Sequence, residues 1–269
     1  MPIVCTALYD RHLTCRDLIE GTELRMRPEA VTFDFHNTLA RCDRWFQLEI
    51  RDLVPAFLCW HARQAGSKVS DAALDLSVEL YRKLRLDIMR HGVEQDAATC
   101  VNVVSRELGL EFEPETIERG LHDVMYAALA GSLPIEGVIP AVHALHEKGV
   151  KLGVVSSAVY HPFLEWSLEK FGIGSAFEII VTSASCGFYK SRTEIYEITL
   201  STLGVTPECA VHVGDSHRFD VETARKFGMQ TIWLDEGDEA TDSHQADVVV
   251  NSLVGVDRIL LNGLSEPMS

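Results

Sequence analysis

The sequence predicts an α/β fold, with a Rossmann-like parallel sheet flanked by helices and an all-helical segment inserted near its start. Two observations support this prediction. After residue 134, short apolar runs alternate with segments of helical periodicity, as in parallel strands joined by helical crossovers. Between residues 45 and 130, apolar residues recur only at helical spacing. A chain of 269 residues is long enough for such a core and a second domain.

The first part of the chain contains one expected strand. The apolar run Ala30-Val31-Thr32-Phe33 predicts a buried strand over residues 30–35, and a loop follows it. Residues 1–28 have mixed charges, and we expect them to form an extension of unknown role that packs on the core. The α/β core is then expected to comprise residues 29–44 and 131–269.

The insert, residues 45–130, is expected to form a helical cap domain. Glycines separate about four stretches in which apolar residues recur three or four positions apart. In the second stretch, Arg82 and Arg85 share one helix face, because residues three apart are neighbours on a helix. We expect this charged face to be solvated, although cap residues of this kind could also contact a substrate.

The last part of the chain should contain five strands and five helices, which alternate except that the last two strands follow each other. Glycines end two of these helices, at Gly149 and Gly228. The expected strands cover residues 151–155, 179–182, 210–213, 231–234 and 248–250. The expected helices cover residues 138–147, 162–171, 193–203, 221–227 and 254–261.

Net charge and cysteine content disfavour several kinds of function and site. A formal net charge of -16 disfavours nucleic-acid binding over a wide surface, because phosphates would be repelled, but it permits a small phosphorylated substrate. The seven cysteines include no Cys-x-x-Cys pair, which indicates reduced thiols rather than disulfides or a zinc site. We expect a cytoplasmic protein with no signal peptide and no membrane segment. The oligomeric state and the identity of the substrate are not predicted.

Four polar residues each lie at or just beyond the end of an expected strand, or in the loop that follows one. They are Asp34, Ser156, Lys190 and Asp215. Because the carboxyl ends of neighbouring parallel strands meet at one crevice, these residues are expected to converge although they are far apart in sequence.

The chemistry of the four residues is coherent. Asp34 and Asp215 offer the carboxylate oxygens that Mg²⁺ prefers. Ser156 can donate a hydrogen bond to a phosphoryl oxygen, and Lys190 can keep Asp34 ionised and stabilise developing negative charge. Asp220 could orient Lys190 or a metal-bound water.

With these motifs the chain resembles the haloacid dehalogenase-like (HAD) superfamily of hydrolases over about residues 30–250. The four motifs occur in the order found in that superfamily, and the helical insert lies where its C1-type cap lies. The stretch 213–224, Val-Gly-Asp-Ser-His-Arg-Phe-Asp-Val-Glu-Thr-Ala, is especially similar.

The resemblance implies a role for each motif residue. Asp34 would be the nucleophile that forms an aspartyl-phosphate, and Mg²⁺ would be held by the Asp34 carboxylate, the His36 backbone carbonyl and Asp215. Ser156 and Lys190 would bind the transferring phosphoryl group of a small phosphorylated metabolite. Further candidates for substrate contact are Asn37, Thr38, Ser157 and Arg44, and candidates for a supporting role are Ser216 and Asp220.

His36 departs from the pattern. Phosphatases of this superfamily normally have Asp at this position, which protonates the leaving group and then activates water. A neutral imidazole can also move protons, so His36 is either an acid–base residue or a position at which only the backbone matters. General acid–base catalysis contributes roughly 10²–10⁴-fold, so a poor substitute predicts a slow enzyme rather than an inactive one.

The leading hypothesis is therefore a Mg²⁺-dependent phosphatase, and three alternatives stay open. Phosphonate (C–P) hydrolases of this superfamily use a cap lysine, and the insert contains only Lys68 and Lys83. C–halogen hydrolysis is disfavoured because the metal motif Gly214-Asp215-Ser216 is intact. The third alternative is a catalytically impaired relative that binds a ligand or a protein partner.

Overall fold

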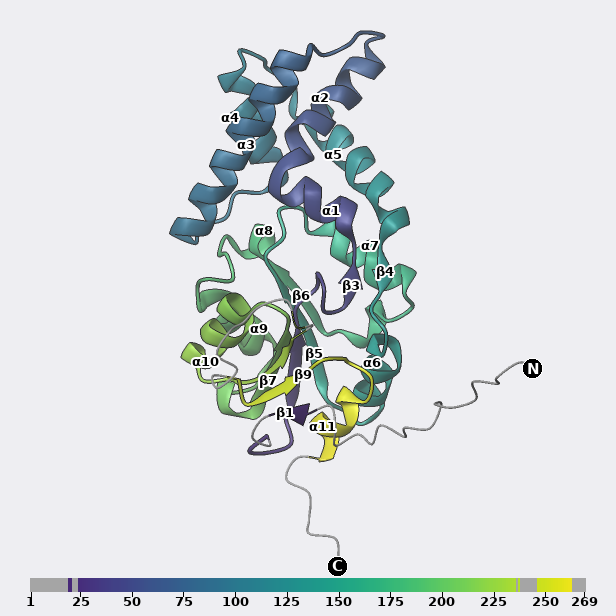
Figure 1. Ribbon diagram of the computed structural model, residues 1–269, viewed down its shortest axis with the longest axis vertical. Coiled ribbons are helices and arrows are strands. Elements are labelled where there is room, and N and C mark those ends of the chain that lie inside the picture. Colours follow the sequence, from purple (N-terminus) through teal and green to yellow (C-terminus); the bar gives the residue numbers. More distant parts are fainter. Residues whose placement is uncertain (1–18, 21–23, 236, 238–245, 263–269) are drawn as a thin grey trace, which may run out of the picture.

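The structure is a computed structural model that describes residues 19–20, 24–235, 237 and 246–262. An α/β core with a seven-stranded sheet lies beneath a group of helices that stands over the carboxyl ends of the central strands (Figure 1). The predicted α/β class with an all-helical insert after the first strand is confirmed. No helix in the described part of the chain has both the length and the apolar character needed to cross a bilayer.

The sheet has the strand order β1-β9-β8-β7-β2-β5-β6, and every pairing is parallel except that of β1 with β9. The central strands are buried on both faces, as parallel strands covered by helices must be, which explains their continuous apolar runs. The strands are β1 (Ile19–Glu20), β2 (Ala30–Phe33), β5 (Lys151–Ser156), β6 (Ile179–Thr182), β7 (Ala210–Gly214), β8 (Gln230–Leu234) and β9 (Val248–Val250).

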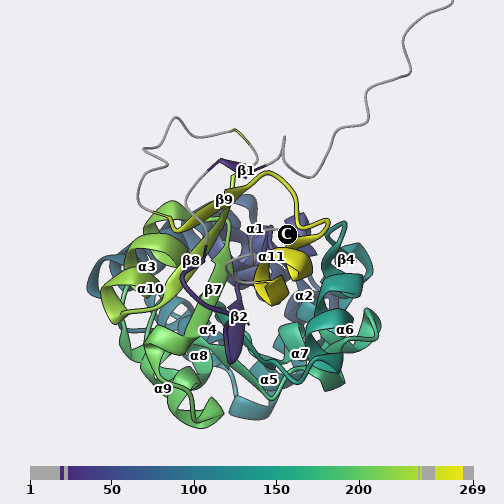
Figure 2. The same ribbon diagram turned by 90° about the horizontal axis from the view of Figure 1, so that it is seen from below.

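Helices cover both faces of this sheet (Figure 2). On one face lie α9 (Glu194–Leu203) and α10 (Thr223–Phe227), and on the other α6 (Val138–Glu147), α7 (Pro162–Lys170) and α11 (Val256–Asn262). Short elements that the sequence pattern did not predict are α8 (Ser183–Cys186) and the 3₁₀ turns Leu129–Gly131, Gly174–Ala176 and Pro207–Cys209.

The helix expected over residues 221–227 begins earlier than predicted. A π-helical turn, His217–Glu222, precedes α10, and the Ser216 hydroxyl accepts a hydrogen bond from the Phe219 N–H at its start. The periodicity of the sequence missed this turn because a π-helix does not follow the 3.6-residue spacing. The turn directs Asp220 toward the ends of the strands.

The insert consists of helices only. They are α1 (Asp43–Gln47), a π-helical turn (Leu48–Asp52), α2 (Leu53–Gln64), α3 (Asp71–His91), α4 (Ala97–Glu107) and α5 (Pro114–Ala128). Helix α3 begins where the Ser70 hydroxyl accepts from the Ala73 N–H, and it ends at Gly92 with a left-handed φ of +70°. Gly120 of α5 lets the rings of Phe57 and Trp60 pack directly against its backbone.

The chain passes between core and insert through two paired segments. Strands β3 (Ala40–Arg41) and β4 (Leu133–Pro134) form a separate antiparallel ribbon. Such short strands show no alternation of apolar and polar residues, so the sequence pattern predicted only loops there. The ribbon holds the two connections side by side.

Backbone hydrogen bonds join the α3–α4 connection to loops of the core. The Glu94 N–H donates to the Gly187 carbonyl oxygen at 2.9 Å, and the Tyr189 N–H donates to that of Gly92 at 3.1 Å. The Ala97 N–H donates to the Val159 carbonyl oxygen at 2.9 Å. These contacts fix the wall of the cavity described below.

The expected extension, residues 1–28, is described only in part. Strand β1 forms one edge of the sheet by pairing with β9, and Leu24 is buried in the core. The remaining residues of the extension, 1–18 and 21–23, lie outside the described residues. All five cysteines in the described part of the chain have free thiols.

Candidate active site

Asp34 lies directly beyond β2, at the carboxyl edge of the sheet. Its N–H donates to the Val213 carbonyl oxygen at 2.9 Å, which continues the pairing of β2 with β7 by one residue. Asn37 then adopts a left-handed φ of 59°, a conformation that Asn tolerates better than most residues, and its N–H donates to the Ala40 carbonyl oxygen at 2.8 Å. This tight turn leads the chain from Asp34 into residues 40–41.

Lys190 joins two carboxylates at this edge. Its Nζ donates to Asp34 Oδ1 at 2.5 Å and also to Asp220 Oδ1, and all three side chains are buried. Burial alone would lower the pKa of Lys190, but the negative charges of Asp220 and Asp34 outweigh it and raise the pKa above its usual value. Lys190 is therefore a fixed ammonium group beside the Asp34 oxygen.

Asp220 is held by three donors. Its Oδ1 contacts Lys190 and, at 3.1 Å, His212 Nε2, while its Oδ2 accepts from the Ser216 N–H at 2.9 Å. Burial would raise the pKa of Asp220, but the Lys190 ammonium and the His212 contact lower it to about 2. A Cβ on Gly214 would overlap this carboxylate, so the glycine is needed here.

His212 extends the chain of contacts into the sheet. Its Nδ1 lies 2.8 Å from the Thr32 Oγ1, and the imidazole is fully buried. The sequence pattern did not single out His212, because one histidine in a buried strand is more often a hydrogen-bonded core residue than part of a site. Its position on β7 directs it toward Asp220.

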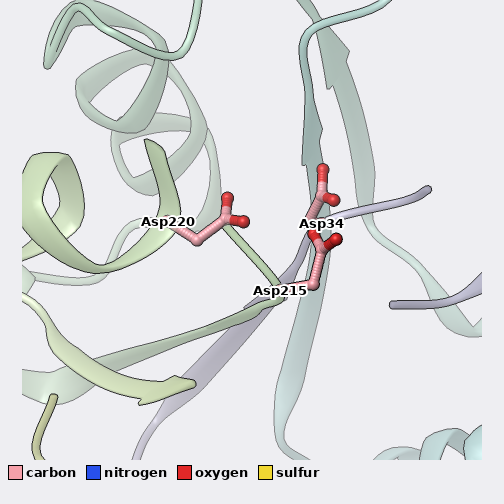
Figure 3. A group of neighbouring side chains, drawn as sticks. All are labelled: Asp34, Asp215 and Asp220. Carbon is pink, nitrogen blue, oxygen red and sulfur yellow. The ribbon is translucent and has the colours of Figure 1, made fainter. Parts of the chain in front are cut away.

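Asp215 lies beside Asp34 at the end of β7 (Figure 3). Burial, the Asp34 charge and the Asp220 charge raise the pKa of Asp215 to about 8, although the Asn37 side chain hydrogen-bonds it. Carboxylate oxygens of Asp34, Asp215 and Asp220 lie within 4.8 Å of one another. Because Asp220 already accepts from three donors, Asp34 and Asp215 are the two carboxylates that fit a hard divalent cation such as Mg²⁺.

His36 points its ring toward α1 of the cap. The imidazole stacks on Phe46 with ring centroids 4.5 Å apart and an interplanar angle of 6°. Burial lowers the pKa of His36, and the neighbouring Asp34 charge offsets this only in part. The Nε2 atom is buried and has no hydrogen-bond partner among the described residues.

The other predicted residues divide into two groups. Ser156, Ser157, Asn37 and Ser216 line the same cavity as Asp34, and the Ser157 Oγ accepts from the Lys190 N–H at 3.1 Å. Thr38 and Arg44 do not line it. Thr38 is fully buried, and Arg44 pairs with Asp52 at 2.9 Å beside a different hollow.

The cavity has a volume of about 560 Å³ and lies between the core and the cap. The sequence pattern did not predict most of its cap wall, because the direction of these side chains depends on how the helices pack. The cap residues that line it are Trp45, Phe46, Gln47, Glu49, Ile50, Arg51, Arg82, Arg85, Leu86 and Met89. Tyr189 and Phe219 contribute from the core.

Two buried charged residues of the cap form part of this wall. Arg85 was expected on a solvated face, but it is buried and pairs with Glu94, whose Oε1 lies 2.5 Å from its Nη1. Glu94 Oε2 also accepts from the Ser183 hydroxyl of the core at 2.6 Å. The ion pair with Glu94 explains why Arg85 is buried. Glu49 is buried as well; burial raises its pKa to about 8, and its Oε2 accepts from the Val159 N–H at 2.7 Å.

Known proteins resemble this chain over most of its length. Residues 75–234 match the model of the family described as "Haloacid dehalogenase-like hydrolase". A "Glyceraldehyde 3-phosphate phosphatase" of Methanopyrus kandleri is 30% identical over 214 residues, which cover 78% of this chain and 84% of that protein. A protein of the same name from Methanothermobacter thermautotrophicus is 30% identical over 244 residues, covering 88% and 97% of the two chains.

Solved structures share the fold. A 2-haloacid dehalogenase from Pseudomonas syringae superimposes with a TM-score of 0.63 at 20% identity, over 86% of this chain and 97% of that one. A HAD phosphatase from Thermococcus onnurineus gives a TM-score of 0.58 at 22% identity over the same shares of the chains. At these identities the similarity establishes the architecture only.

Proposed function

This chain belongs to the haloacid dehalogenase-like hydrolase family, and we propose that it is a magnesium-dependent phosphatase that hydrolyses a small phosphorylated metabolite through an aspartyl-phosphate on Asp34. The observation that supports this most directly is the Lys190 ammonium held between Asp34 and Asp220 at the cavity floor. A buried carboxylate with a fixed cation beside it is suited to attack phosphorus while the cation stabilises the phosphoryl oxygens.

The proposed reaction has two displacements at phosphorus. In the first, an Asp34 oxygen attacks, the bond from phosphorus to the ester oxygen breaks, and the departing alkoxide takes up a proton. In the second, water attacks the same phosphorus, loses a proton, and the bond to the Asp34 oxygen breaks to release inorganic phosphate. Ser156 and the Lys190 ammonium bind the transferring phosphoryl group in both steps.

Mg²⁺ is proposed to bind the Asp34 and Asp215 carboxylates. The donor set fits, because two carboxylates and a phosphoryl oxygen are typical Mg²⁺ ligands. Burial, followed by the Asp34 and Asp220 charges, raises the pKa of Asp215, and a divalent cation would offset those charges. When bound, the ion supplies positive charge that offsets the charge of the phosphoryl group, and we propose that the His36 backbone carbonyl is a further ligand.

The cavity lining favours phosphate esters over phosphonates. Among the described residues that line it there is no cap lysine, since neither Lys68 nor Lys83 is one of them. A carbonyl substrate would therefore find no cap amine with which to form an imine, and the amine of Lys190 is held as an ammonium group between Asp34 and Asp220. The names of the two relatives support the same reaction class and suggest glyceraldehyde 3-phosphate as the first substrate to assay.

The enzyme is proposed to work in the reducing cytoplasm on a metabolite rather than on a nucleic acid. The free thiols of the described cysteines support the compartment. The net charge of -16 supports the choice of ligand, because a phosphate polymer would be repelled.

Phosphate release by the purified protein tests the proposal. We expect Mg²⁺-dependent turnover on a panel of metabolite phosphates that includes glyceraldehyde 3-phosphate, and loss of at least roughly 10³-fold in kcat for Asp34→Asn, as is usual when a nucleophile is removed. Acid-quenched wild type should carry covalent phosphate that Asp34→Asn lacks. Asp75→Asn, an exposed aspartate of α3, is the matched control and should behave as wild type. Absence of turnover on the whole panel, or full activity of Asp34→Asn, would contradict the proposal.

A further inference from the structure

Three exposed apolar side chains of the cap lie around one cavity. Phe46 of α1, Ile50 of the π-helical turn and Leu86 of α3 are 38%, 39% and 51% exposed, and all three line the cavity above Asp34. They come from different elements, so their meeting is a product of the tertiary structure. Exposed apolar residues that gather in one place commonly mark a surface for an apolar ligand.

Three further lining residues are apolar or aromatic. Met89 lies one helical turn beyond Leu86 on α3, and methionine adapts its shape to an apolar partner. On the core side, Tyr189 and Phe219 form an edge-to-face pair with ring centroids 5.6 Å apart. A group that extends from the phosphate centre would therefore lie between the apolar side chains of the cap and two aromatic rings of the core.

The arginines that line the cavity are poorly suited to bind a second anionic group of a substrate. Three arginines line the cavity, but Arg85 is paired with Glu94 and Arg51 with Asp52. Arg82 forms none of the ion pairs found among the described residues, and it is exposed. Strongly anionic substrates would gain at most one surface arginine, which contributes little in water.

The cavity volume also favours a substrate that is larger than a triose phosphate. A cavity of about 560 Å³ lies within the range of roughly 300–1,000 Å³ that is typical of pockets for drug-sized ligands. A triose phosphate would occupy the floor beside Asp34 and leave the apolar mouth in contact with water.

We propose that the preferred substrate is a phosphate monoester whose alcohol part carries an apolar, preferably aromatic, group, and that Ile50, Leu86 and Met89 determine this specificity. This inference rests on the proposed phosphatase function. Burial of Leu86 and Ile50 against the substrate supplies binding energy that a small polar alcohol cannot provide. The substrate class therefore differs from the triose phosphate in the names of the relatives.

A matched pair of esters tests the inference. 2-Phenylethyl phosphate and glycerol 3-phosphate are both esters of primary alcohols, so they differ mainly in the group that would fill the cavity mouth. We expect kcat/KM for the phenylethyl ester to exceed that for glycerol 3-phosphate by about tenfold or more, the usual worth of an apolar subsite.

Two variants of helix α3 test whether Leu86 contributes to the preference for the phenylethyl ester. Leu86→Asp should reduce the ratio of the two kcat/KM values about tenfold. Leu76→Asp is the matched control, because Leu76 is 44% exposed on the same helix but does not line the cavity, and it should leave the ratio unchanged. Ile50→Asn provides a second test at a different element, and circular dichroism verifies that each variant is folded.

The outcomes separate the inference from the proposed function. Turnover of both esters with equal or better use of glycerol 3-phosphate would overturn the inference and leave the phosphatase function standing. A preference for 3-phosphoglycerate over both would also overturn it, since that result would point to Arg82. If no ester is hydrolysed, the proposed function fails, and calorimetry with 2-phenylethylphosphonate and methylphosphonate tests the apolar subsite by itself: tighter binding of the former supports the subsite, and equal binding overturns it.

Discussion

His36 lies in the loop after Asp34, where its ring contacts the first helix of the cap. Its ring is parallel to that of Phe46, and its Nε2 has no hydrogen-bond partner among the described residues. An imidazole held by stacking is poorly placed to follow a proton between the leaving group and water. Phosphatases of the haloacid dehalogenase-like superfamily normally have a carboxyl group on a shorter side chain at this position.

We therefore expect His36→Asp to increase kcat for the best phosphate ester by at least about tenfold, the lower part of the range for general acid–base catalysis. The aspartate is too short to stack on Phe46 and would leave its carboxyl group in the cavity. His36→Asn has a similar size but cannot transfer a proton, so it should not give this gain. Steady-state kinetics of the two variants measure the effect, and a lower kcat for His36→Asp would show that the imidazole itself is the acid–base group.

The two π-helical turns illustrate how single elements shape the site. One, Leu48–Asp52, interrupts the α1–α2 helix and presents Glu49 and Ile50 to the cavity, and the other, His217–Glu222, presents Asp220 to Lys190. An extra residue per turn rotates the side chains that follow, and such turns occur frequently at functional sites. Both lie beside the proposed catalytic centre.

Helix α3 is attached to its surroundings by a buried ion pair. Arg85 contacts Glu94 in the α3–α4 connection, and Glu94 in turn accepts from Ser183 of the core. The pair therefore links the cap wall of the cavity to a loop of the α/β core.

Breaking this pair should destabilise the protein strongly. We expect Arg85→Met to lower the free energy of unfolding by about 3–5 kcal/mol, because it leaves the Glu94 carboxylate buried and uncompensated. Arg44→Met removes an exposed pair with Asp52 and should cost only about 0–1 kcal/mol. Urea titrations of the three proteins provide the comparison, and equal losses for the two variants would show that burial of the pair has no energetic consequence. Since Arg44 lies outside the cavity, its variant should also retain the KM of wild type.

At the scale of the whole molecule, negative charge is concentrated at the sheet edge, where three carboxylates of the described part of the chain lie close together. Asp34, Asp215 and Asp220 repel one another there, and Lys190 compensates only part of their charge. Stability of the whole fold should therefore depend on a cation at this position, since a ligand that binds only the folded state stabilises it.

Addition of Mg²⁺ should raise the melting temperature. At a concentration about 100 times its Kd the gain is about 2.7 kcal/mol, and each kcal/mol corresponds to roughly 2–4 °C for a domain of 150–250 residues. Asp215→Asn should abolish this response, while Asp75→Asn keeps it. Calorimetric scans with Mg²⁺ and with EDTA measure the difference, and an equal Mg²⁺ response of Asp215→Asn would contradict the assigned metal position.

Local sequence patterns were sufficient to predict most of the core. The boundaries expected for helix 138–147 and strand 179–182 match the structure. The convergence of Asp34, Ser156, Lys190 and Asp215 also followed from the sequence, because parallel strands place their carboxyl ends at one edge whatever the length of the connections. Apolar periodicity is a property of neighbouring residues, so one chain suffices to read it.

The cap wall was decided only by the tertiary structure. Which face of α3 lies over the cavity depends on how that helix packs against the core, and so the sequence could not show that Arg85 is buried while Arg44 remains outside. The same holds for His212, because the tertiary structure decides that its imidazole contacts Asp220. The sequence by itself determined the edge of the sheet at which the candidate site lies, because the carboxyl ends of parallel strands share one edge. Packing between distant elements determined which side chains line the cavity above that edge, because the partners of a side chain depend on contacts that no local pattern encodes.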